Sequence, residues 1–456
     1  MAAVSFAHAA PGEPGRWQVL RLAALSVPIY AAAQPVMAFV PAILSRHYGI
    51  GLASLGLVFL IGQAVNALLD PLVGALSDRT ASRFGRRRPW VAGGGVLFLF
   101  GSALLFFPPA GVGIGWVAAG AFLYFCGSSI ATTALLAWSG EISGDYRRRT
   151  AIASLFTFLS AAALVLALLL PAIADRVRPG DGPLRLTLFG ALVLATGLPG
   201  LWLTLTAVPD PAAPAVRTRP GLRAALRAVF ADRQLLRVLA ADTLVTSGQG
   251  VRTALLLFVV TLYLGRPEWA GALFLFQYSF GLLAAPIWQR IGRTLGKARA
   301  AVLAELAQAA INLGLLALTP DRFGLMLALA AAQGLTQGAG NLMLRAMVAD
   351  LADAARADSG EERGGLFYSA FSISAKLGGA LALGLALPLL GALGFDPHGA
   401  NGPAALHALL LVFALGPALG HAAAAALLTG FPLDEAAHSE IRARLTARDA
   451  ALVPAE

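Results

Sequence analysis

The sequence predicts an all-α membrane protein with twelve transmembrane helices in two six-helix bundles, and three observations support this fold class. Of the 456 residues, 58% are hydrophobic and only 13% are charged, whereas about a quarter of the residues in a soluble protein are charged. Apolar runs of about 20 residues, long enough to cross a bilayer, recur along the chain. Arginine and lysine are concentrated in every second loop, as in proteins that cross a membrane repeatedly.

The apolar runs form two groups of six, separated by an arginine-rich stretch. The first group lies near 20–45, 53–77, 90–108, 112–139, 150–174 and 184–208, and the second near 238–264, 268–289, 300–319, 323–350, 365–394 and 402–430. This pattern predicts a cytoplasmic N-terminus at 1–19, a first bundle at 20–208, a linker at 209–237, a second bundle at 238–430 and a tail at 431–456. The linker contains an amphipathic segment that we expect along the inner membrane surface, and the tail is expected to be a short soluble helix.

The distribution of basic residues predicts the orientation. Loops after even-numbered runs contain 20 lysines and arginines, and loops after odd-numbered runs contain six. The positive-inside rule therefore places both termini in the cytoplasm, with the protein in a bacterial-type inner (plasma) membrane. The net charge of +10 reflects this topology, so we expect the lipid bilayer and a small solute as partners, and no nucleic acid.

The residues that usually carry catalysis or bind metals do not form a recognisable pattern. The single cysteine, Cys126, excludes a disulfide framework and a thiolate metal cluster. The six histidines form no close ligand motif, and no nucleophile–base pattern or phosphate loop occurs. We therefore expect neither a metal nor a cofactor, and a membrane enzyme or pigment-assembly factor is a disfavoured alternative.

The most informative stretch is DPLVGALSDRTASRFGRRRPW at residues 70–90. Asp70 lies inside an apolar run, where a carboxylate is costly and is by default functional. Pro71 has no N–H to donate to the carbonyl of Ala67, which leaves that oxygen available to a cation. Asp70 is thus a candidate proton or cation carrier. The alternative is a structural counter-ion to a buried base.

Four segments resemble one transporter family over nearly the whole chain. They are the 70–90 stretch, GEISGDYRRRT at 140–150, MVADLAD at 347–353 and KLGGALALGLALPLLGALGF at 376–395. Together they are similar to the glycoside–pentoside–hexuronide cation symporters of the major facilitator superfamily, the melibiose permease type. The 70–90 stretch is also similar to the hinge of sucrose transporters. The resemblance implies cation-coupled symport of a sugar-like or sugar-acid solute by alternating access between two bundles.

The resemblance also implies roles for particular residues. It places Asp70 in the cation site, pairs it with Lys376 of the eleventh run, and aligns Asn66 and Thr132 with family acids. It further implies a cytoplasmic gate in which acids face arginines and Gly74 permits close helix approach. The gate candidates are Gly74, Asp78, Arg79, Arg83, Glu141, Asp145, Arg147 and Arg148.

Substrate contacts are expected from polar residues inside the apolar runs. Arg252 would anchor a carboxylate or a pair of sugar hydroxyls if it faces the cavity; if it pairs with an acid instead, it is structural. The uncharged candidates are Tyr30, Gln34, Thr157, Gln249, Gln337 and Asn341.

The chain departs from the family pattern in ways that bear on the coupling ion. Acids expected in the first, second and fourth runs are missing, and Thr157 aligns with an expected arginine. Because sodium needs several oxygen ligands and a proton needs one titratable group, we favour H+ over Na+. An uncoupled facilitator remains open, as does a lysophospholipid or other amphiphile transporter of the same superfamily. We expect a monomer.

Overall fold

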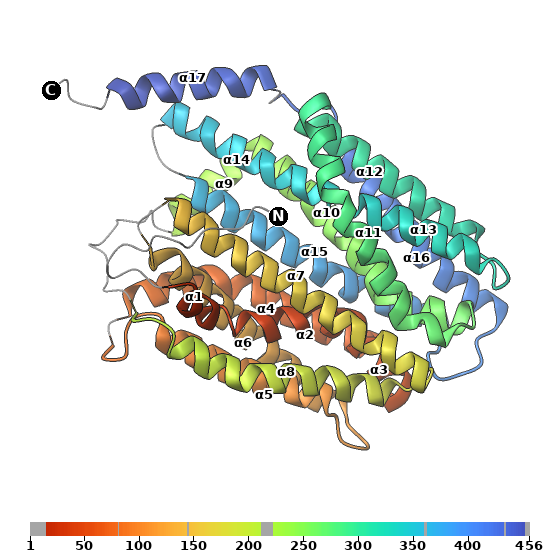
Figure 1. The fold of residues 1–456 in the computed structure, drawn as a ribbon. Helices are drawn as coiled ribbons and strands as arrows, with labels where there is room; N and C mark the ends of the chain where they lie inside the picture. Colours follow the sequence, from red (N-terminus) through yellow and green to blue (C-terminus); the bar gives the residue numbers. More distant parts are fainter. Residues whose placement is uncertain are drawn as a thin grey trace. The chain divides into compact units, whose positions relative to one another are not determined.

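The computed structural model describes residues 15–80, 82–143, 146–210, 222–359, 363–432 and 435–451. Every regular element in these ranges is a helix (Figure 1). Eleven of the described helices are long and apolar enough to cross a membrane. The all-α membrane fold predicted from the sequence is therefore confirmed.

The first group of apolar runs forms five long helices and one interrupted helix. The long helices are α4 (Leu52–Arg79), α5 (Arg88–Phe106), α6 (Ile114–Glu141), α7 (Tyr146–Val177) and α8 (Gly182–Leu205). The run at 20–45 is divided into α1 (Arg16–Leu22), α2 (Ser26–Ala38) and α3 (Val40–Tyr48). Pro41, at the start of α3, cannot donate a helical hydrogen bond, which explains the interruption beside it.

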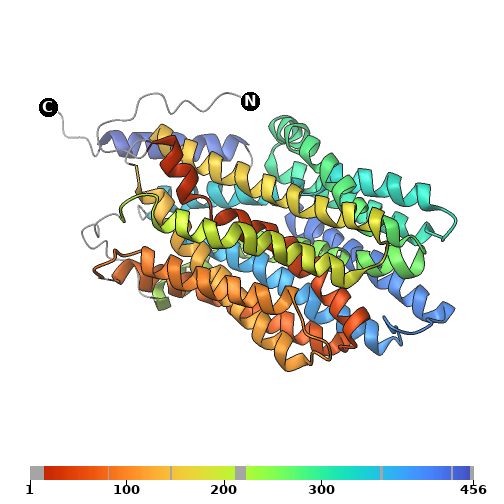
Figure 2. The same cartoon turned by 60° about the horizontal axis from the view of Figure 1, so that its bottom comes forward.

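The second group is more irregular. Its helices are α9 (Leu222–Ala231), α10 (Arg233–Phe258) with a π-helical turn η1 (Val259–Tyr263), η2 (Pro267–Trp269), α11 (Ala270–Leu295), α12 (Lys297–Gly314) with η3 (Leu315–Ala317), α13 (Phe323–Thr336), α14 (Ala339–Ser359), α15 (Gly364–Ala392) and α16 (Pro403–Leu428). The tail forms α17 (Glu435–Ala451). Figure 2 shows the same helices from a second direction.

The prediction of one continuous helix at 323–350 is wrong. Gln337 has an extended backbone between α13 and α14, and Gly338 has a φ of +79°. Glycine adopts this left-handed conformation without the steric cost that other residues bear. Neither half meets the length and composition of a single span, so eleven of the twelve predicted spans are found as such among the described residues.

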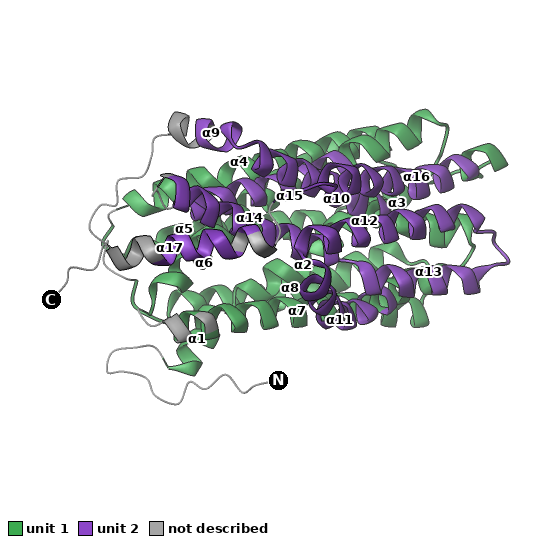
Figure 3. Ribbon diagram, turned by 90° about the horizontal axis from the view of Figure 1, so that it is seen from above, with its two compact units in different colours: residues 1–217, 253–275, 383–406 green, residues 218–252, 276–382, 407–456 purple. Residues whose placement is uncertain are grey.

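Contacts divide the chain into two compact units (Figure 3). Unit 1 comprises Met1–Arg217, Thr253–Leu275 and Leu383–Leu406, and unit 2 comprises Thr218–Arg252, Phe276–Ala382 and His407–Glu456. Unit 1 thus includes two segments from the second half of the sequence. They pack on helices of the first half; for example, the ring centres of Phe274 and Phe39 are 5.1 Å apart. The division along the chain into two bundles stays a prediction.

Glycines allow α5 and α6 of unit 1 to pack backbone against backbone. A Cβ atom placed on Gly127 would overlap the backbone nitrogen of Phe98, and one on Gly101 would overlap that of Tyr124. The rings of Phe98 and Tyr124 pack together beside these glycines, with centres 5.5 Å apart. Small residues at such positions permit the close approach that stabilises helix pairs in membranes.

We expect Gly127→Ala to lower the free energy of unfolding by about 1–3 kcal/mol, because the added methyl group has no space. Gly93→Ala is the matched control: it lies on the same helix pair, and a Cβ there meets no described atom within 4 Å. It should be neutral or stabilising by up to about 1 kcal/mol. Denaturant titration in micelles would compare them, and equal stabilities would contradict the packing argument.

Candidate functional site

Asp70 lies in a cluster of oxygen atoms between α4 and α6. Its Oδ1 atom accepts hydrogen bonds from Ser129 Oγ at 2.5 Å and Thr133 Oγ1 at 3.2 Å. The Ser129 hydroxyl also lies 3.4 Å from the carbonyl oxygen of Asn66. A carboxylate surrounded by hydroxyl and carbonyl oxygens can bind a proton or a small hard cation.

The residues that form this cluster differ in part from those predicted from the sequence. Asn66 contributes its backbone oxygen, while its side chain donates to Gln63 at 3.2 Å. The hydroxyl that reaches Asp70 from α6 belongs to Thr133, beside the predicted Thr132. Ser129 was missed, although Ser129 and Thr133 are four residues apart and so share one helix face.

Lys376 is partly buried on α15. It belongs to unit 2, whereas Asp70 belongs to unit 1. The pairing of these two residues therefore stays a prediction.

The loop between α4 and α5 contains a network of ion pairs in unit 1. Arg87 donates to Asp78, to Glu141 Oε1 at 2.7 Å and to Ser77 Oγ at 2.6 Å. Arg86 reaches Glu141 Oε2 at 2.6 Å. Burial lowers the pKa of Arg87, but hydrogen bonds and charge attraction from Glu141 and Asp78 outweigh it, so the net pKa is raised. Arg87 thus remains charged and ties the C-terminal ends of α4 and α6 together.

The same network reaches the segment after α8. The carboxylate of Asp210 accepts the backbone N–H groups of Arg87 at 2.5 Å and Arg88 at 2.9 Å. The side chain of Arg88 donates to the carbonyl of Val208 at 2.8 Å. Asp210 was not predicted from the sequence, because nothing local distinguishes it from Asp232, the other acid of the linker.

The remaining predicted gate residues are placed differently. Arg79 and Arg83 are exposed, and Arg83 stacks on Phe84. Gly74 does not mark a close helix approach, since a Cβ placed there meets no described atom within 4 Å. Arg148 is buried. Asp145 and the side chain of Arg147 lie outside the described part of the chain.

Unit 2 contains an ion pair at the corresponding place in the second group of helices. Lys297, at the start of α12, donates to both oxygens of Asp350 at 2.6 and 2.7 Å. Asp350 lies in the middle of α14, nine residues before its last residue, whereas Glu141 is the last residue of α6. Both ion pairs join the beginning of the third helix of a six-helix group to the fourth, which is what duplication of a six-helix unit would produce.

A buried ion pair in unit 1 joins segments from both halves of the sequence. Asp175 Oδ1 accepts from Arg185 Nε at 2.6 Å, and Asp175 Oδ2 accepts the backbone N–H of Gly271 at 2.7 Å. Both side chains are almost completely buried. Because Asp175 and Arg185 border an odd-numbered loop, this contact lies on the predicted outer side.

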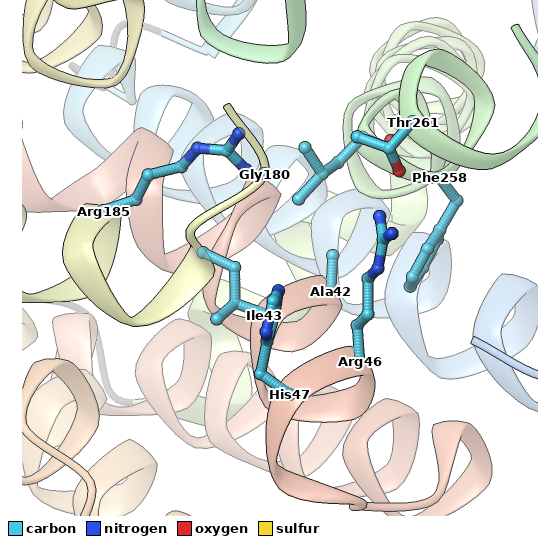
Figure 4. A pocket seen from close by; sticks show the side chains of 9 residues that line it. Ala42, Ile43, Arg46, His47, Gly180, Arg185, Phe258 and Thr261 are labelled. Atoms are coloured by element: carbon cyan, nitrogen blue, oxygen red, sulfur yellow. The ribbon is translucent and has the colours of Figure 1, made fainter. Parts of the chain in front are cut away.

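A small basic pocket lies nearby in unit 1 (Figure 4). It is lined by Ala42, Ile43, Arg46, His47, Gly180, Arg185, Leu257, Phe258 and Thr261. It has room for about one water molecule, so a sugar-sized solute does not fit. Burial lowers the pKa of His47, and the charges of Arg46 and Arg185 lower it further. His47 is therefore neutral at physiological pH.

The break between α13 and α14 is the centre of a polar cluster in unit 2. Arg252 Nη2 donates to Gln277 Oε1 at 2.9 Å, and Gln277 Nε2 donates to Gln337 Oε1 at 2.5 Å. Gln337 is the extended residue at the break itself. In membrane transporters, interrupted helices commonly line the substrate site.

Arg252 is a buried cation with unused donors. It is 4% exposed, and its Nε and Nη1 atoms have no hydrogen-bond partner among the described residues. Its guanidinium group lies 5.9 Å from the ring centre of Phe413. Of the two interpretations of Arg252, the structure does not support pairing with an acid, since its hydrogen-bond partner is an amide.

A second chain of hydrogen bonds adjoins the first turn of α14. Gln249 donates to Asn341 Oδ1 at 3.0 Å, and Asn341 lies 3.4 Å from Asp242 Oδ1. The other Asp242 oxygen accepts from Ser374 Oγ at 2.7 Å. The structure therefore brings four predicted substrate residues to one broken helix: Arg252, Gln249, Gln337 and Asn341.

The other three predicted substrate residues lie in unit 1. Tyr30 packs against the alanines of α2 and α7. Gln34 is half-buried, and its Nε2 has no partner among the described residues. Thr157 is exposed and donates to the carbonyl of Ala153 in its own helix at 3.0 Å.

The profile of a family described as MFS/sugar transport protein matches residues 25–435. The chain belongs to this family. As a member of the MFS/sugar transport protein family, it is a multi-pass membrane transporter and not an enzyme. The resemblance inferred from the 70–90 stretch is thereby confirmed.

Three relatives of this MFS/sugar transport protein are named as symporters. The chain is 24% identical to an uncharacterized symporter of Synechocystis sp., over 88% of this chain and 91% of that one. It is 25% identical to the putative glycoside/cation symporter YagG of Escherichia coli, over 74% of each chain. It is also 25% identical to the uncharacterized symporter YnaJ of Bacillus subtilis, over 88% of each.

Solved transporter structures share the fold. The nucleoside transporter NupG superposes with a TM-score of 0.65 at 12% identity, covering 90% of this chain and 99% of that one. A bacterial homologue of the lysosomal transporter Spinster superposes with a TM-score of 0.63 at 15% identity, covering 94% and 98%. At these identities the likeness concerns the fold alone.

Proposed function

We propose that this symporter couples the entry of a carboxylated sugar, such as a hexuronate, to cations, with H+ favoured over Na+. The observation that carries the proposal is Arg252. A buried guanidinium with unused donor atoms beside a helix break is matched by an anionic carboxylate, which accepts charge-assisted hydrogen bonds. Gln277, Gln337, Gln249 and Asn341 supply amides suited to the hydroxyl groups of the sugar ring.

Asp70 is the proposed cation site in unit 1. Ser129 and Thr133 donate hydrogen bonds to its carboxylate within the membrane span. One carboxylate with hydroxyl neighbours is sufficient for a proton. The absence of further acids in the matching family positions supports H+ over Na+.

The test is solute-driven proton movement in liposomes that contain a pH dye. D-glucuronate, D-glucose and lysophosphatidylcholine would be added with and without sodium, to the natural protein, Asp70→Asn and the control Asp358→Asn. Asp358 is an exposed acid paired with Arg444. We expect glucuronate to acidify the lumen in the natural protein and the control, but not in Asp70→Asn.

Other outcomes would replace the proposal. Sodium-dependent uptake without acidification would identify Na+ as the coupling ion. Uptake that needs neither ion and persists in Asp70→Asn would indicate an uncoupled facilitator. A response to lysophosphatidylcholine alone would indicate an amphiphile transporter.

A further inference from the structure

Unit 2 contains a carboxylate and an imidazole in direct contact inside the membrane domain. Glu305 on α12 and His421 on α16 are separated by 2.5 Å between Oε2 and Nδ1. Their side chains are 2% and 1% exposed, respectively. The Nε2 atom of His421 has no hydrogen-bond partner among the described residues. A buried ionisable pair of this kind is by default functional in a membrane protein.

We propose that Glu305 and His421 form a second proton-binding site, distinct from Asp70, and that the transporter moves two protons in each cycle. With one proton, the pair is neutral overall, whether the proton is on the oxygen or on the nitrogen. Burial favours this neutral form, because an uncompensated charge is costly away from water.

The negative charge of Asp242 favours the binding of a further proton at this site. It is completely buried on α10 and interacts electrostatically with Glu305. Its oxygens are bonded to the neutral groups of Ser374 and Asn341, and no cation pairs with it among the described residues. The three groups carry one net negative charge when the pair holds a single proton, and one further proton neutralises them.

The surroundings of the pair contain no other described charge in contact with it. From α14 it faces the backbone of Gly340, against which Glu305 Oε1 is packed. From α10 it faces Asp242 and Gly248, where a Cβ would lie 3.5 Å from the His421 ring. His421 Nε2 is the position left open for a proton to enter or leave.

The same contacts connect the pair to the proposed substrate residues. Gly340 is in the first turn of α14, two residues after the left-handed Gly338. The next residue, Asn341, bonds both Gln249 and Asp242. A change of proton occupancy at Glu305 therefore acts on the helix end that carries Gln337 and Asn341. This step rests on the proposed function, because it assigns those residues to the solute.

A second proton changes the net charge that moves with each solute molecule. A carboxylated sugar carries one negative charge, so symport with one proton moves no net charge, whereas symport with two protons moves one positive charge inward. An inside-negative potential of about 100 mV would then drive about 50-fold accumulation, since it supplies about 2.3 kcal/mol per charge and 1.4 kcal/mol is a factor of ten.

The experiment measures D-glucuronate accumulation in liposomes under an imposed potential or an imposed pH gradient. The natural protein would be compared with Glu305→Gln, His421→Gln, Asp242→Asn and the control His407→Gln, an exposed histidine on the same helix as His421. We expect the natural protein and the control to respond to both gradients. Asp242→Asn, which removes the charge that the further proton neutralises, and the two variants of the pair, which remove the contact that holds this proton, should all lose the roughly 50-fold response to potential. All three should keep pH-driven uptake and exchange of labelled for unlabelled solute.

Two results would overturn the proposal while leaving the proposed function intact. One is pH-driven uptake in the natural protein that is indifferent to potential. The other is potential-driven uptake that survives in all three site variants. If glucuronate is not transported at all, the proposed function fails. Proton binding at the second site is then tested by the difference between infrared spectra of the purified protein at acidic and alkaline pH. If this difference is identical in the natural protein and in Glu305→Gln, the second proton-binding site is overturned.

Discussion

Replacement of Arg252 by glutamine is expected to raise the KM for D-glucuronate by at least about 30-fold. A buried carboxylate that loses its hydrogen-bonded cationic partner loses about 2–5 kcal/mol. Arg252→Lys retains the charge but not the planar guanidinium group. Its KM should therefore lie between the KM of the natural protein and that of Arg252→Gln. Initial uptake rates at varied glucuronate concentration would measure the change.

Two comparisons keep this prediction specific. D-glucose has no carboxylate, so Arg252→Gln should affect any glucose uptake far less than glucuronate uptake. Arg266→Gln is the matched control, because Arg266 is half-exposed outside the polar cluster and lies 3.9 Å from Glu268. If glucuronate and glucose uptake fell equally, Arg252 would be structural and would not bind a carboxylate.

Replacement of Arg87 by glutamine is expected to lower the free energy of unfolding by roughly 2–4 kcal/mol. Arg87 is 3% exposed and bonds both Asp78 and Glu141, so its loss leaves two acids short of a cation. Those acids are 21% and 28% exposed. Water therefore solvates them partly, and the decrease in the free energy of unfolding should be smaller than for a fully buried ion pair. Denaturant titration in micelles would measure it.

Arg79→Gln and Arg83→Gln serve as controls from the same loop. Both arginines are exposed, and such surface substitutions change stability by no more than about 0.5 kcal/mol. Equal losses in all three variants would mean that the total charge of the loop, and not the Arg87 network, stabilises this end of the protein.

Several site residues were predictable from the sequence because their chemistry conflicts with a membrane. Asp70, Arg252 and Lys376 stand out as charges in apolar runs, where each charge is costly. The arginine cluster at 83–88 predicted a charged network at the end of α4. The pattern did not indicate which arginines pair with the acids. Arg86 and Arg87 do so, because they lie just before α5 and are buried, whereas Arg79 and Arg83 are exposed.

Other site residues could not be identified from one sequence. Glu305 and His421 are 116 residues apart, and only the tertiary structure brings them together. Each is inconspicuous alone, as a single acid near a span end or an isolated histidine. Ser129 and Asp210 were missed for the same reason, since a hydroxyl or a linker acid gains meaning only from its partner.

The sequence by itself determined the class of protein, its number of apolar runs and its family, because hydrophobicity, loop charge and the 70–90 stretch are local properties of the chain. The tertiary structure decided where α13 and α14 part, which polar groups meet at that break, and which ions pair. Those features depend on distances between residues far apart in sequence. Side-chain hydrogen bonds and ion pairs form only over a few ångströms, and periodicity along the chain does not encode such distances.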